Sequence, residues 1–314
     1  MSSATDLTKF KGKHVSDLPP GASGYELKSA EETLNEFADS GLTITSSKDW
    51  VETLPQTFAF PEHSNPLDFL KVKDQQQVGA CAGFGMAQAG EGCFWVASGG
   101  KVRRISGWAQ YILAQEKGDM RQRNGGFDRR QDIGSHPKDV AWAAMNIGLV
   151  PEQMCPPSPT TYDQGWEVTD AMREAAGENK IKSIVHFTKP AHLFKYLQTG
   201  QGYITMACKW MAHFDQGPKK DPVNSFFGPQ RQDRHGGGHQ VSIMGFTNHA
   251  QHGLCALIVN SWNTVWRDDG AALFTMKAIE EAMSDQMSIF LGYSDMSVKE
   301  KKQRKIDIVH SDWV

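Results

Sequence analysis

Cys81 lies where the sequence favours a reactive thiol. It follows a glutamine run that begins at Gln75, and it opens a segment of small residues in "DQQQVGACAGFGMAQ". A structural cysteine usually has larger apolar neighbours. A thiol becomes a nucleophile when a helix start or a neighbouring cation stabilises its thiolate and a base accepts its proton. The helix start can be local here, whereas the base must come from elsewhere in the chain.

His239 is the best candidate for that base. It follows three glycines in "HGGGHQVSIMGF" and starts an expected strand, from which an imidazole can face a cleft. Asn260 closes the apolar strand of "CALIVNSW", where its carbonyl can orient the histidine ring. Trp262 follows closely enough to cover the pair from water. A thiol, an imidazole and an orienting amide are the groups that acyl transfer through a thioester requires.

These segments resemble those of papain-like cysteine peptidases, over residues 54–276 and in the family's order. Each segment alone is a weak match, and the shared order argues against chance. The matching segments are "LPQTFAF" (mature start), "DQQQVGACAGF" (nucleophile), "GSHPKDVAWAAMNIGLVPE" (substrate cleft), "GHQVSIMGF" (histidine) and "LIVNSWNTVWRDDGAALFTM" (Asn-Ser-Trp).

The resemblance implies a role for each candidate residue. Cys81 would be the nucleophile, His239 the base and acid, and Asn260 the residue that orients the ring. Gln75 would provide the side-chain donor of an oxyanion hole. The helix start and an adjacent imidazolium would together lower the thiol pKa and form an ion pair before substrate arrives.

The remaining implied roles concern substrate binding, where the chain also departs from the family. Gly134 and Ser135 fall where the family's cleft backbone holds an extended substrate, but a glycine commonly stands in place of Ser135. Ala82 stands where a tryptophan usually follows the nucleophile, and Val78 where secreted members have a disulfide cysteine. These departures affect the expected specificity more than the expected activity.

The elements that must position these residues fall into a helical first half and a strand-rich second half. The residue pattern therefore predicts an α+β fold, and the resemblance implies two lobes, one helical and one an antiparallel β-barrel-like lobe, with a cleft between. Residues 50–73 contain three prolines and are expected to be extended. Helices are predicted at 29–40, 81–98, 105–117, 137–145, 165–179 and 190–198, and strands at 183–187, 202–210, 239–247, 255–262 and 271–276.

The chain divides into three expected parts: an N-terminal extension (1–53), a catalytic domain (54–297) and a polar tail (298–314). Within the extension, Ser29 and Glu32 form a capping-box pattern at the start of a helix. The stretch "LNEFADS" is similar to part of the pro-regions of papain-like enzymes. The extension is therefore either a packed addition to the domain or a pro-like segment that restrains the site.

Composition excludes several classes of protein. The net charge of −3 over 314 residues argues against a general nucleic-acid or anionic-membrane role, and no apolar run reaches membrane-spanning length. The N-terminus lacks a signal peptide, and the five cysteines are widely spaced, so reduced thiols in an intracellular protein are expected. A viral or phage particle is an alternative location. No metal or cofactor is expected, since the glycines between His235 and His239 disfavour a helical zinc pair.

Three classes of function remain open. The first is a peptidase acting on peptide or protein substrates. The second is another acyl transfer on the same fold, such as deamidation or transamidation. The third is a non-catalytic papain-fold scaffold within a larger assembly, whose partner the sequence does not identify. The complete set of Cys81, His239, Asn260 and Gln75 argues against the third class. The departures at Ala82 and Ser135 keep the second class open, and a peptidase is the preferred interpretation.

Overall fold

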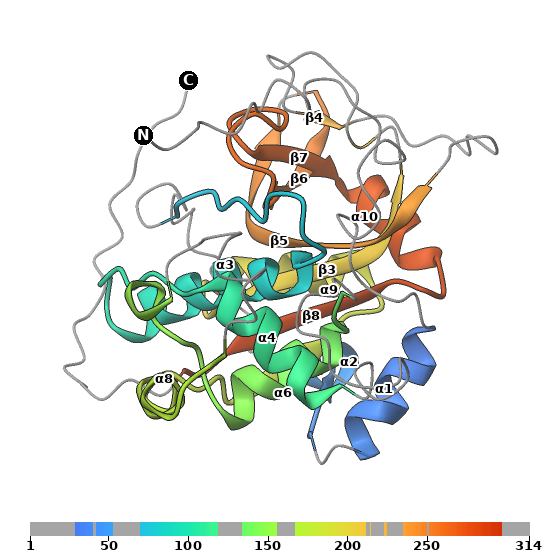
Figure 1. Ribbon diagram of the computed structural model, residues 1–314. Helices are drawn as coiled ribbons and strands as arrows, with labels where there is room; N and C mark the ends of the chain where they lie inside the picture. Colours follow the sequence, from blue (N-terminus) through green and yellow to red (C-terminus); the bar gives the residue numbers. More distant parts are fainter. Residues whose placement is uncertain are drawn as a thin grey trace.

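The computed structural model describes residues 29–39, 42–52, 70–118, 134–155, 167–211, 214, 223–224, 235–249 and 251–296. Within this part α1, α3, α4 and α6 lie on one side of a mixed sheet, and α9 and α10 pack together on the other (Figure 1). The α+β class predicted from the sequence is confirmed. No helix among these residues is long and apolar enough to cross a membrane.

The helices match most of the predicted ones, with boundaries that follow their capping residues. Ser29 and Glu32 do form a capping box, with the Ser29 N–H 2.8 Å from the Glu32 carboxylate and the Glu32 N–H 3.1 Å from the Ser29 hydroxyl. The helices are α1 (Ala30–Asp39), α2 (Ser47–Glu52), α3 (Cys81–Ala97), α4 (Gly107–Lys117), α6 (Pro137–Asn146), α8 (Asp170–Ala176), α9 (Pro190–Gln198) and α10 (Met276–Ser284), with a 3-10 turn at Glu152–Met154.

The described strands form one eight-stranded sheet in the order β1-β2-β8-β3-β5-β6-β7-β4. Its two edge pairs, β1 with β2 and β4 with β7, are parallel, and the inner pairs are antiparallel. The strands are β1 (Thr45–Ser46), β2 (Ser183–His186), β3 (Gly202–Met211), β4 (Val223–Asn224), β5 (His235–His249), β6 (Gly253–Val259), β7 (Ala271–Thr275) and β8 (Ile289–Ser294).

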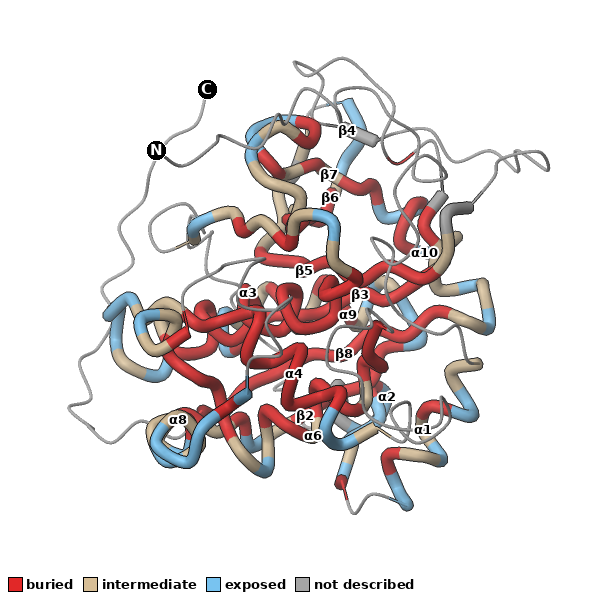
Figure 2. Tube along the Cα trace, viewed as in Figure 1, coloured by how far each residue is buried: buried red, intermediate tan, exposed pale blue. Residues whose placement is uncertain are grey.

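Helix α3 is the centre of the molecule and is buried over most of its length (Figure 2). It packs on α4 on one side and on β3 and β5 on the other. Gly83 allows the close approach of α4, since a Cβ there would meet the Gly107 carbonyl oxygen at 2.5 Å. Gly92 likewise allows the Tyr203 ring to lie against the helix. The glycines that weaken α3 as an isolated helix are therefore used for packing.

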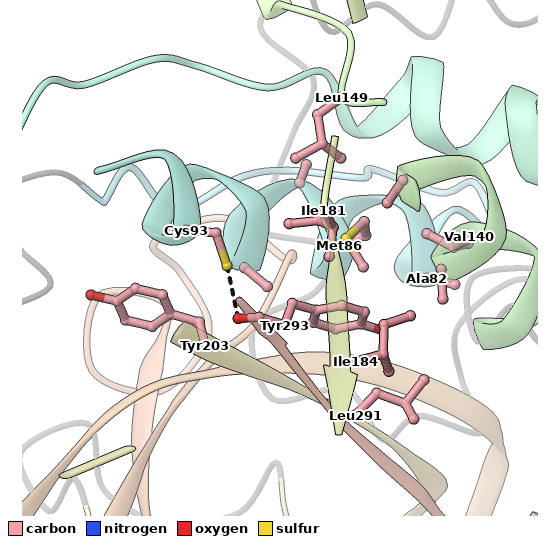
Figure 3. Close-up of a cluster of buried hydrophobic side chains, with 14 of the residues drawn as sticks. Ala82, Met86, Cys93, Val140, Leu149, Ile181, Ile184, Tyr203, Leu291 and Tyr293 are labelled. Atoms are coloured by element: carbon pink, nitrogen blue, oxygen red, sulfur yellow. Dashed lines mark hydrogen bonds between the residues drawn. The ribbon is translucent and has the colours of Figure 1, made fainter. Parts of the chain in front are cut away.

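Farther along α3, an apolar cluster joins the helix to the middle of the sheet (Figure 3). There the Cys93 thiol donates a hydrogen bond to the Tyr293 carbonyl oxygen at 3.1 Å. Tyr293 belongs to β8, whose residues are all buried. This cluster anchors the C-terminal part of α3, so the position of its first residue depends on the whole sheet.

The described part of the N-terminal extension is packed against the domain. Phe37 and Leu42 belong to the same apolar cluster as α3, and Lys138 of α6 lies 2.8 Å from the Glu36 carboxylate. Strand β1 also adds to the sheet beside β2. These contacts are those of a packed extension, and restraint of the site stays a prediction. The proposed boundary after residue 53 and the tail at 298–314 lie outside the described residues.

Three local predictions need correction. The extended segment predicted from residue 50 is wrong at its start, because α2 continues to Glu52, and residues 53–69 lie outside the described part. The helix predicted at 165–179 is observed only as Asp170–Ala176, since Thr169 caps its start and residues 177–179 form a turn. Strand β8 and helix α10 were not predicted at all, although β8 lies inside the sheet between β2 and β3.

Candidate active site

A tight turn leads from Gln75 into Cys81, the first residue of α3. The Gln75 side-chain amide donates to the Val78 carbonyl oxygen at 2.8 Å, and the Ala80 N–H donates to the same oxygen at 2.7 Å. Within the described part of the chain, no side chain caps the start of α3 at Ala80. The thiol therefore lies at a helix N-terminus, where backbone N–H groups favour a negative charge.

Gln75 is held by Ser261, a residue that the sequence reasoning did not select. The Ser261 hydroxyl donates to Gln75 Oε1 at 2.6 Å, and the Gln75 N–H donates to the Ser261 carbonyl oxygen at 2.8 Å. Because Oε1 accepts from a hydroxyl, the orientation of the amide is set and its nitrogen must face the turn. The signal was present in the Asn-Ser-Trp motif, whose serine adjoins Asn260.

His239 and Asn260 are hydrogen-bonded, with His239 Nε2 2.8 Å from Asn260 Oδ1. Asn260 Oδ1 also accepts the Ser261 N–H at 2.7 Å, which fixes the oxygen rather than the nitrogen at this position. His239 Nε2 must therefore carry the proton, and Nδ1 is the basic nitrogen. Nδ1 is buried and makes no hydrogen bond within the described residues.

Two tryptophans enclose the imidazole. Trp262 stacks on the His239 ring with 4.5 Å between centroids, as its proposed shielding role requires. Trp210 of β3 meets the same ring edge-on at 4.7 Å. Sequence reasoning missed Trp210, because its approach depends on how β3 and β5 pair, with Cys208 opposite His239.

Burial determines the charge of His239. Its removal from water lowers the pKa of the imidazole to about 4, and the hydrogen bond to Asn260 opposes part of that shift. At neutral pH the ring is therefore a neutral base. Burial therefore disfavours the imidazolium of the thiolate–imidazolium pair expected from the sequence.

Two contacts bring the nucleophile helix to the histidine strand. Gln240, next to His239, donates from its side-chain amide to the carbonyl oxygen of Ala82, next to Cys81, at 3.2 Å. Ser242, also on β5, donates from its hydroxyl to the carbonyl oxygen of Gly85 in the same helix at 2.9 Å. The structure thus brings the predicted nucleophile and base into one buried region.

Burial affects the other four cysteines of the chain. Burial raises the pKa of Cys93 to about 12 and that of Cys155 to about 11, and it also raises the pKa of Cys208 and Cys255. None of the five cysteines forms a disulfide, and all five lie in the described part of the chain. Thiols with raised pKa values remain protonated and unreactive near neutral pH.

Gly134 and Ser135 lie on the segment that enters α6. The Gly134 N–H donates to the Tyr111 hydroxyl at 3.1 Å, and its carbonyl oxygen accepts from Gln115 at 3.3 Å. The Ser135 hydroxyl is buried and forms no hydrogen bond within the described residues. No contact of these two residues with Cys81 or His239 is established, so their role in substrate binding stays a prediction.

The site is closed in this structure. The side chains of Cys81, His239 and Asn260 are fully buried, as is that of Gln75. A substrate carbonyl can reach the thiol only if neighbouring groups move. The reactive groups are therefore brought together but are covered by neighbouring residues.

Comparison with solved structures identifies the fold. The chain is similar to xylellain, a cysteine protease from Xylella fastidiosa, with a TM-score of 0.57 and 16% identity over 90% of this chain and 96% of that chain. It is also similar to procathepsin B S9 from Trypanosoma congolense, with a TM-score of 0.58 and 13% identity over 92% of this chain and 89% of that one. A third similar structure is digestive procathepsin L 3 from Tenebrio molitor, with a TM-score of 0.55 and 14% identity over 90% and 78% of the two chains.

No protein-family model matches the sequence, and no curated protein matches it either. At these low identities the structural likeness shows the fold alone. The chain has the papain-like two-lobe fold, as the motif order predicted.

Proposed function

We propose that this papain-fold protein is a cysteine peptidase that cleaves peptide bonds through a thioester on Cys81. One observation carries the proposal. The hydrogen bonds at Asn260 place the proton of His239 on Nε2 and leave Nδ1 as the basic nitrogen, in a strand bonded to the start of the nucleophile helix. This arrangement has the parts that thioester chemistry requires: a thiol at a helix start, a neutral base and a group that orients the base.

In the first step, the Cys81 sulfur attacks the substrate carbonyl carbon while its proton passes to His239 Nδ1. The resulting imidazolium keeps its Nε2–H bond to Asn260 Oδ1, which stabilises the charge. The helix N-terminus favours the developing thiolate. Because burial favours the neutral ring, the ion pair forms during attack and not before it.

The substrate oxygen becomes an oxyanion in the tetrahedral intermediate. Its proposed donors are the Cys81 backbone N–H and the Gln75 side-chain nitrogen. The bond from Gln75 Nε2 to the Val78 carbonyl oxygen holds this amide beside the turn that leads to Cys81. Each donor of this kind typically lowers the barrier by about 3 kcal/mol.

The intermediate then collapses. The C–N bond breaks, and His239 Nδ1 gives its proton to the leaving amine, which leaves an acyl thioester on Cys81. Water then attacks the thioester carbon and loses a proton to His239 Nδ1. The C–S bond breaks, and the sulfur recovers that proton. No external oxidant, metal or cofactor is needed to balance these steps.

Peptide-library digestion with the wild type and Cys81→Ala tests this function. Fragments that form only with the wild type support a peptidase. Ammonia release without new fragments would instead indicate a deamidase acting by the same residues. Absence of any Cys81-dependent product would favour the scaffold and contradict the proposal.

A further inference from the structure

Gln88 is a fully buried amide on the nucleophile helix. It follows Cys81 by about two helical turns, so the two side chains lie along the same face of α3. That face packs against β5, the strand that carries His239. Gln88 is therefore in a position to affect the reactive groups without touching them.

Each end of the Gln88 amide bonds to a different part of the site. Its nitrogen donates to the main-chain carbonyl oxygen of Asn260 at 3.2 Å. Its oxygen lies 2.9 Å from the Ser242 hydroxyl, which is also 2.9 Å from the Gly85 carbonyl oxygen of α3. When the hydroxyl donates to Gln88, it sets which end of the amide faces Asn260.

These bonds link three segments that are far apart in the sequence. Asn260 is bonded to Gln88 through its backbone and to His239 through its side chain. Ser242 lies on β5 two residues beyond Gln240, so both face α3, and Gln240 bonds to the first turn of the helix. A single side chain thus joins the nucleophile helix to the base strand and to the residue that orients the base.

We infer that Gln88 is a positioning residue for the reaction of Cys81. Its amide holds the Asn260 backbone and β5 at a fixed place relative to α3, so that His239 Nδ1 is directed at the thiol. This role rests on the proposed function of Cys81 and His239. Gln88 touches no reacting atom and acts only through Asn260 and Ser242.

Gln110 provides a matched control. It is a fully buried glutamine on the neighbouring helix α4, and its amide also donates to a main-chain carbonyl oxygen, that of Gly148, at 3.2 Å. Its hydrogen bond joins α4 to the loop after α6 and not to residues of the site. Gln88→Met and Gln110→Met remove comparable buried amides and leave side chains of similar length.

Two measurements on the full-length protein separate positioning from general packing. The first is the rate constant for iodoacetamide alkylation of Cys81 as a function of pH. The second is the ¹⁵N NMR signal of the His239 ring. Gln88→Met should slow alkylation about 10- to 100-fold and shift the His239 signal, since small displacements of reacting groups have effects of this size. Gln110→Met should alter neither measurement appreciably.

Two further variants provide additional tests of the inference. If Gln88→Met does not fold, Ser242→Ala removes only the hydroxyl that orients Gln88 and should slow alkylation in the same direction by a smaller factor. His239→Ala tests the proposed function itself. If that variant leaves Cys81 alkylation unchanged, the proposed function fails, and the positioning role of Gln88 fails with it.

The inference is overturned if Gln88→Met matches Gln110→Met in both measurements while His239→Ala slows alkylation. In that case the proposed function stands and Gln88 merely satisfies polar groups in the core. If only Ser242→Ala can be measured, an unchanged alkylation rate and an unchanged His239 signal overturn the inference equally.

Discussion

The side-chain amide of Gln240 donates to the carbonyl oxygen of Ala82 at 3.2 Å, so the neighbours of His239 and Cys81 are bonded to each other. This bond joins the first turn of α3 to β5 within the buried core. The relative position of base and nucleophile is therefore a property of the folded core and does not depend on bound substrate.

Gln75 should act on the oxyanion and not on the thiol itself. Gln75→Ala is expected to lower kcat on a peptide substrate about 10²- to 10³-fold, because one oxyanion donor is lost. Alkylation of Cys81 forms no oxyanion, so its rate should change by a few-fold at most. The exposed neighbour Gln77 provides the control, and Gln77→Ala should leave both rates unchanged. An equal loss in both assays would show that Gln75 acts through structure alone.

His239 should make the stability of the protein depend on pH. Its pKa falls from 6.5 to about 4 on burial, so between these values the unfolded chain binds a proton that the folded chain does not. The free energy of unfolding should therefore decrease as pH falls through this window, by up to roughly 3 kcal/mol. Urea unfolding at pH 7 and pH 4.5 should show a larger loss for the wild type than for His239→Gln. An identical loss in both proteins would contradict the burial of a neutral ring.

Lys73 should hold the turn before Gln75 against α3. Its buried ammonium lies 2.7 Å from the Glu91 carboxylate of α3 and 3.3 Å from that of Glu152. Lys73→Met removes a positive charge beside the buried Glu91 carboxylate. This change should lower the free energy of unfolding by about 3–5 kcal/mol. Lys138→Met removes a partly exposed pair with Glu36 and should cost less than about 1 kcal/mol. Chemical denaturation of both variants checks the difference, and equal losses would refute it.

Phe37 tests the role of the N-terminal extension. This ring is 1% exposed and belongs to the apolar cluster around α3. A packed extension predicts that Phe37→Ala lowers the free energy of unfolding by about 3–5 kcal/mol and leaves the alkylation rate of Cys81 unchanged. A restraining extension predicts faster alkylation in this variant, as well as a higher peptidase rate for a chain that starts near Leu54. Faster alkylation would therefore reject the purely packed role.

The sequence singled out residues that the fold brings into one buried region, but it missed part of the sheet. Cys81, His239 and Asn260 could be selected because each stands at the end of an expected helix or strand. Neighbouring glycines or an apolar run mark that end in the sequence. Strand β8 was missed because all six of its residues are buried and give no alternating pattern. Helix α10 follows β7 directly, with Thr275 as its cap, and the apolar run continues across that boundary.

Residues that act through strand pairing could not be predicted. Trp210 meets His239 only because β3 and β5 pair in one register, and Gln88 meets Ser242 only because α3 crosses β5. In the sequence each is a single residue with no distinctive neighbours. Ser261 was closer to detection, because it lies inside the motif that contains Asn260.

Selective alkylation of Cys81 is the most direct test of the account. The full-length protein is treated with iodoacetamide near neutral pH, and the adducts are mapped by mass spectrometry. Cys81 should react first, because the helix N-terminus favours its thiolate and His239 can accept its proton, and His239→Ala should largely abolish this preference. Slow and uniform labelling of several cysteines, unchanged in His239→Ala, would contradict the assignment of Cys81 as an activated nucleophile.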